Sequence, residues 1–170
     1  MKVFSIIFSC LFILCCCTRQ SAQLPSNKGS ENQEQMDMMT YNKMCIEAEN
    51  AEIQSYLDSS SIEFVKSDAG FWYKIVNTNN GEKVNNLVTI SGTVQVLGGE
   101  PCHQLNNLTL RLGKRDHTKV LDLALAKTHV SDEIWIVSPS SLAYGIKGIT
   151  NCITSRTPVL YKIKILKTNE

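Results

Sequence analysis

The stretch IWIVSPSSLAYGIKGITNCITSRTPVLYKIKIL, residues 134–166, carries the clearest structural pattern in the chain. Its first four residues are apolar and end at Ser138-Pro139, which is typical of a strand that stops at a proline. A long loop follows, and residues 159–166 then alternate lysine with apolar side chains. That alternation predicts a strand with one face toward solvent. Two strands joined by a long loop are therefore the starting point of the predicted fold.

Upstream of this stretch, further segments alternate or are rich in aromatic and β-branched residues. The strands that we expect cover residues 71–76, 87–97, 108–112, 134–137 and 159–166. A lone glycine, Gly92, stands inside the second of them and predicts a bulge or the close approach of another group. Residues 117–127 predict a short helix, for which Asp116 is available as a cap.

Residues 36–58 have apolar side chains at roughly helical spacing and contain neither proline nor glycine. They predict an amphipathic helix, strongest over residues 43–57. The connections between the expected strands are of hairpin length. We therefore predict an α+β domain: an antiparallel sheet with the short helix packed on one face, preceded by the N-terminal helix.

The length and the net charge of the chain exclude some classes of protein. The chain has 170 residues, enough for one domain with accessory segments, and its 17 basic and 16 acidic residues leave a net charge of +1. Without a basic excess we expect no nucleic-acid partner. The three cysteines after residue 17 form no CxxC pair, and the three histidines lack the spacing of metal ligands. A metal or cofactor is therefore not expected, and no G-x-S-x-G nucleophile motif is present.

The first residues look like a targeting signal. A lysine is followed by an apolar run over residues 3–14, too short for a membrane span, and then by Leu14-Cys15-Cys16-Cys17. This resembles a bacterial lipoprotein signal, in which Cys17, or as a second choice Cys16, would be acylated. A plain signal peptide or a short membrane helix is the alternative.

These patterns divide the chain into four parts. We expect a signal peptide over residues 1–16, a flexible tether over 17–35, the helix over 36–61 and the folded domain over 62–170. The protein would then be exported and held at the membrane of the cell envelope by its lipid.

One reaction that needs no nucleophile, metal or cofactor is rotation about an X–Pro amide. Its barrier is about 18–20 kcal/mol because the C–N bond has partial double-bond character. An apolar pocket can lower this barrier by fitting the twisted amide better than the planar one.

The C-terminal stretch resembles the signature of FKBP-type peptidyl-prolyl isomerases. The shared pattern is an apolar strand, Pro139, the Ala143-Tyr144-Gly145 loop and the alternating strand to Leu166. The likeness covers about residues 70–167, and the helix with the segment 70–73 is similar to the N-terminal extension of FKBP-type lipoproteins linked to gliding motility. The resemblance implies an FKBP-like sheet wrapped on a short helix, and proline-containing segments as partners. We expect a monomer.

The resemblance also implies site residues. Tyr144 matches the family tyrosine whose hydroxyl donates to the bound chain. The other residues carried over as catalytic are Tyr161, Ile153 and Leu121, and those carried over as substrate-binding are His103, Cys102, Leu108, Ile149 and Cys152.

On one side of the expected pocket the chain departs from the family. Cys102-His103 stand where the family has an aromatic residue and an aspartate, Leu108 replaces an aromatic, and the floor tryptophan falls on Leu121 or Val120. The family's strand tyrosine falls near Gly92. Two functions follow: an isomerase assisting the folding of exported proteins, or a weak or inactive module that binds a partner segment in the cell envelope. A Cys102–Cys152 disulfide is conceivable, but we expect free thiols.

Overall fold

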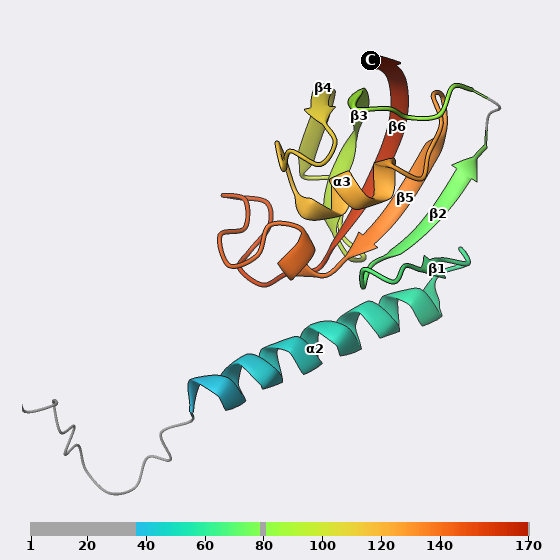
Figure 1. Ribbon diagram of the computed structural model, residues 1–170. Coiled ribbons are helices and arrows are strands. Elements are labelled where there is room, and N and C mark those ends of the chain that lie inside the picture. The colour runs from blue at the N-terminus through green and yellow to red at the C-terminus, as the bar shows by residue number, and fades with distance from the viewer. Residues whose placement is uncertain (1–36, 79–80, 170) are drawn as a thin grey trace, which may run out of the picture. The chain divides into compact units, whose positions relative to one another are not determined.

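The computed structural model describes residues 37–78 and 81–169, which all belong to one compact unit. Its centre is a six-stranded sheet in which every neighbouring pair is antiparallel, with the strand order β1-β2-β5-β6-β3-β4 (Figure 1). The strands are β1 (Val65–Lys66), β2 (Trp72–Asn77), β3 (Leu87–Val96), β4 (His103–Arg111), β5 (Glu133–Ser138) and β6 (Val159–Asn169). The helices are α2 (Met38–Ser59), α3 (Lys119–Leu125) and the 3-10 helix η1 (Ser140–Leu142). The predicted antiparallel α+β architecture is confirmed.

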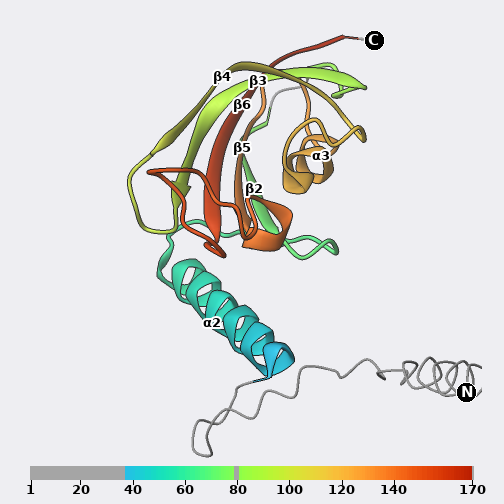
Figure 2. The same ribbon diagram turned by 90° about the vertical axis from the view of Figure 1, so that its left-hand side faces the viewer.

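Helix α3 lies against one face of the curved sheet (Figure 2). Val120, Leu121, Ala124 and Leu125 are buried there. They join the side chains of one sheet face, such as Ile136 and Tyr161, in the main core. Burying a leucine or isoleucine stabilises the folded state by about 1.5–3 kcal/mol, so this short helix is held by packing rather than by its own length.

Gly92 confirms both expectations for a glycine inside a strand. The pairing of β3 with β4 shifts register between Ile90 and Gly92, as in a β-bulge. A Cβ atom on Gly92 would lie 2.2 Å from the carbonyl oxygen of Lys162 on β6. The backbones of β3 and β6 therefore approach too closely at this point for any side chain.

Several elements differ from the prediction. Strand β4 begins at His103, five residues before the predicted start at Leu108, because pairing with β3 holds a segment that is too polar to show alternation. Helix α3 is shorter than predicted, and its N-cap is Thr118. Asp116 instead accepts a hydrogen bond of 3.0 Å from Nε of Arg111. The two-residue strand β1 was not predicted, since two residues are too few for a periodic signal.

The predicted N-terminal helix is confirmed as α2, and its fully buried apolar contact lies in its C-terminal half. Ile53 is 1% exposed and clusters with Val137 and Leu160. These two strand residues alternate with Ile136 and Tyr161 of the main core, so α2 packs on the sheet face opposite to α3. Among the described residues, no helix combines the length and the apolar character needed to cross a bilayer.

Candidate peptide-binding site

The loop between β5 and β6, residues 139–158, has a defined shape because its backbone bonds to itself. The amide of Gly145 donates to the carbonyl of Ser140 at 2.8 Å, and the amide of Arg156 donates to the carbonyl of Gly145 at 2.9 Å. Ile149 and Ile153 exchange backbone hydrogen bonds of 2.7 and 2.9 Å. Tyr144 is thereby held at one position against the core.

Tyr144 packs between two rings. Its ring is stacked on that of Tyr161, with centroids 6.1 Å apart and planes inclined by 22°. The ring of His117 meets it edge to face, with centroids 6.3 Å apart. The Tyr144 hydroxyl is buried and makes no close hydrogen bond among the described residues, although the neighbouring Tyr161 hydroxyl acts to lower its pKa. Burial raises the pKa of Tyr144, so the hydroxyl keeps its proton at neutral pH and remains able to donate.

Tyr161, by contrast, has a paired hydroxyl. Its oxygen lies 3.2 Å from Oγ1 of Thr118, the N-cap of α3. Burial, together with the neighbouring Tyr144, raises the pKa of Tyr161 well above its usual value. Tyr161 is fully buried, so its ring is an apolar wall of the core rather than a surface group.

The structure brings the expected apolar residues together in one cluster. Leu121, Tyr161 and Ile153 are buried in the main core, and partly buried side chains packed against it include Leu108, Tyr144, Ile149 and Cys152. These side chains therefore pack in one apolar cluster, and their role as a binding site stays a prediction. Leu121 and Tyr161 both have an exposed fraction of 0%, so neither can touch a ligand while the site is closed.

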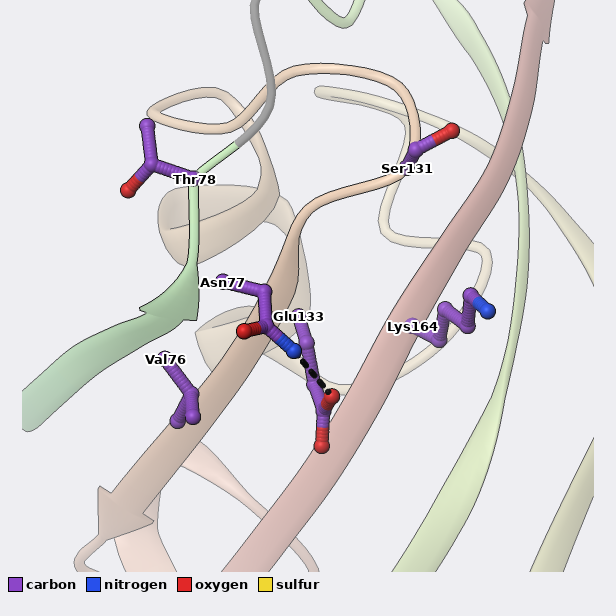
Figure 3. A pocket seen from close by; sticks show the side chains of 6 residues that line it. All are labelled: Val76, Asn77, Thr78, Ser131, Glu133 and Lys164. Carbon is purple, nitrogen blue, oxygen red and sulfur yellow. Dashed lines mark hydrogen bonds between the residues drawn. The ribbon is translucent and has the colours of Figure 1, made fainter.

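None of the five hollows described on this surface is lined by Tyr144, Tyr161, Ile153 or Leu121. The one in Figure 3, of about 440 Å³, lies where β5 begins and is polar. There Nδ2 of Asn77 donates to Glu133 at 3.1 Å. The Tyr144 loop leaves the other end of β5, after Ser138, and five residues of strand span about 17 Å. None of these five hollows is therefore the apolar pocket expected beside Tyr144.

Cys102 and Cys152 form a disulfide with their Cα atoms 5.3 Å apart, so the prediction of free thiols is wrong for this pair. Cys45, on α2, is free. The bond ties the residue before β4 to the loop that carries Tyr144. The pairing is the alternative that the sequence leaves open, and the fold brings together two cysteines that are 50 residues apart in sequence.

His103 lies half-buried at the start of β4. It is close enough to His117 for its charge to help lower the pKa of the His117 imidazole, although burial is the larger cause. His117 and Thr118 are the site residues that sequence reasoning missed. Their position was the available indication, because His117 and Thr118 are polar residues directly before a helix whose side chains are buried in the core. Among the described residues, no three His, Cys, Asp or Glu side chains are grouped as they would be around a metal ion.

No family model and no curated protein matches this chain. Solved structures do match it. A peptidyl-prolyl cis-trans isomerase from Pseudomonas syringae has a TM-score of 0.64 and 16% identity, over 84% of this chain and 100% of that one. AtFKBP13 has a TM-score of 0.58 and 19% identity, over 64% of this chain and all of its own. The chain has the FKBP-type fold.

A third solved structure with the FKBP-type fold, FkpA from Escherichia coli, has a TM-score of 0.60 and 18% identity. It matches 76% of this chain, which spans 64% of the FkpA chain. At these identities the likeness establishes the fold. The similarity to gliding-motility lipoproteins stays a prediction.

Proposed function

We propose that this FKBP-type domain is a peptidyl-prolyl cis-trans isomerase that assists the folding of exported proteins. The observation that carries the proposal is the Tyr144 hydroxyl. It is a protonated donor that is buried beside the apolar side chains of the core, with the Tyr161 hydroxyl as a neighbour but no close hydrogen bond among the described residues. A buried donor without a partner costs stability, so its retention points to a ligand that accepts from it.

In this proposal the Tyr144 hydroxyl donates to a carbonyl of the bound chain and fixes its position. Tyr161, Ile153 and Leu121 supply apolar walls that keep water from the X–Pro amide. Twisting the amide removes its double-bond character, and the twisted form needs less solvation, so a dry wall favours it. Since Leu121 and Tyr161 are covered, part of the loop over them, which includes Ile149, moves to admit the segment.

The second candidate is a module of the same fold that binds a polypeptide segment without catalysis. Leucine at positions 108 and 121, where the resemblance leads one to expect aromatic rings, favours this candidate. Leucine fills the core but offers less area to a proline ring than an aromatic side chain does.

We also propose that the domain acts at a membrane surface in the cell envelope, as a monomer anchored by lipid on Cys17. Cys17, the signal peptide and the tether lie outside the described residues. The proposal therefore rests on the sequence pattern, in which Leu14 precedes Cys17 by three residues. Stable anchoring needs more than one buried acyl chain, as lipoprotein-type acylation provides.

A refolding assay limited by proline isomerisation tests the proposed activity. We expect the protein to accelerate refolding and Tyr144→Phe, which removes only the hydroxyl, to abolish most of the gain. Tyr73→Phe is the matched control, since Tyr73 also packs against the core but lies on β2. Titration with a short X–Pro peptide separates the two candidates. Binding without acceleration supports the second, and neither binding nor acceleration would contradict both.

A further inference from the structure

His117 carries the second unpaired polar atom of the site. Its Nδ1 is buried and has no hydrogen-bond partner among the described residues, as is also the case for the hydroxyl of Tyr144. Buried polar groups in folded proteins are almost always hydrogen-bonded. Here two buried polar atoms without a close hydrogen bond lie on rings that contact each other, which points to a ligand that binds both rings.

The contacts of the cluster show which group is free to bind. Thr118 lies next to His117 in the chain, but its hydroxyl already pairs with Tyr161 at 3.2 Å. The rings of His117 and Tyr144 have centroids 6.3 Å apart. In an extended chain the N–H and C=O of one residue point to the same side, and residues two apart, about 6.6 Å, do so too, so one bound segment can reach both rings.

The charge state of His117 suits it to accept a hydrogen bond. Burial lowers the pKa of the imidazole and His103 lowers it further, while Asp122 opposes them. The ring is therefore neutral at pH 7, and with the proton on Nε2 its Nδ1 is an acceptor.

We infer that His117 is a specificity residue of the site, whose Nδ1 accepts from a backbone N–H of the bound segment while Tyr144 donates to a carbonyl. This inference rests on the proposed function. The nitrogen of an X–Pro amide carries no hydrogen, so the N–H belongs to residue X or to the residue after proline. The ligand class is a proline-containing segment with a free N–H beside the proline. A run of consecutive prolines is disfavoured because the backbone donor is missing.

Calorimetric titration of the full chain with three peptides tests this assignment: an acetylated Ala-Leu-Pro-Phe amide, and the same peptide N-methylated at Leu or at Phe. We expect one methylated peptide to bind about three- to tenfold more weakly than the parent, the loss of one hydrogen bond. His117→Leu should weaken binding of the parent peptide by the same factor and leave binding of that methylated peptide unchanged. His117→Asn should restore much of the affinity, since its side-chain oxygen takes the place of Nδ1.

The outcomes separate this inference from the proposed function. If the wild type binds the parent peptide and Tyr144→Phe weakens it but His117→Leu does not, the role of His117 is wrong while the binding function stands. If the wild type binds none of the peptides, the proposed function fails and the inference fails with it. Should His117→Leu not fold, His117→Asn and His117→Gln decide. Asn but not Gln should keep the affinity, and equal affinities of the two would overturn the assignment.

Discussion

Glu49 of α2 accepts two hydrogen bonds from Ser140, 91 residues away in sequence, through the backbone N–H and the hydroxyl of that serine. Ser140 opens the loop that holds Tyr144. A second tie joins the far end of the same loop to α2, because Arg156 donates to Oδ1 of Asn42 at 2.9 Å and lies over the ring of Tyr41. The N-terminal helix thus holds the site loop at both ends.

Glu49→Ala should loosen this loop. Hydrogen bonds to a charged group are worth about 1.5–3 kcal/mol, so we expect a lower melting temperature and faster hydrogen exchange at the amide of Ser140. Glu47→Ala is the matched control on the same helix, since the ion pair of Glu47 with Lys43, at 3.8 Å, is exposed. Equal exchange of the Ser140 amide in the two variants would show that the contact does not hold the loop.

Tyr144→Phe should bind peptide more weakly and yet be at least as stable as the wild type. The hydroxyl that it removes is buried without a partner among the described residues, and such a group costs about 1–3 kcal/mol. Chemical denaturation and peptide titration on the same sample measure both effects. A clear loss of stability would mean that the hydroxyl has an internal partner and is not kept for a ligand.

Cys102→Ser with Cys152→Ser should destabilise the domain by about 2–4 kcal/mol, the range for a disulfide that closes a loop of this length. A reducing agent should lower the melting temperature of the wild type and leave that of the double variant unchanged. Cys45→Ser is the control, since Cys45 is free. If the intact mass under non-reducing conditions shows no loss of two hydrogen atoms, the disulfide is absent.

Gly92→Ala should be strongly destabilising because its Cβ would meet the Lys162 carbonyl oxygen at 2.2 Å. Overpacking of this kind costs about 1–3 kcal/mol. Gly99→Ala is the comparison, since its nearest contact would be 3.4 Å, from the carbonyl oxygen of Val96. Similar unfolding midpoints for the two variants would contradict the close approach of β3 and β6.

Stability should fall as the pH drops below about 6.5, the ordinary pKa of histidine. Burial lowers the pKa of His117 in the folded state, so over this range the unfolded chain takes up the proton first. Proton uptake by the unfolded chain favours unfolding, and the loss ends below the folded-state pKa. His117→Asn should flatten this part of the stability profile. An unchanged slope between pH 7 and 5 in that variant would assign the dependence to other groups.

Local periodicity was enough to predict five strands, both α-helices and the long loop before the last strand. The side chains of a strand point alternately to its two faces, so the side that faces the core can be read from consecutive residues. This holds for the alternation over 159–166 and for the apolar run of 134–137. Gly92 was also informative, because a glycine inside a strand indicates that another backbone comes too close for a side chain. Tyr144 could be singled out since its loop keeps a short, specific motif.

Tertiary structure alone decided the rest. The partners of Cys102 and Glu49 lie 50 and 91 residues away along the chain, and no local pattern encodes such contacts. The closed core and the paired rings of His117 and Tyr144 depend on how α3 and the loop fill the sheet. How densely side chains pack depends on contacts between distant segments. The sequence therefore predicted a pocket beside Tyr144, but it could not predict that Leu121 and Tyr161 are fully buried.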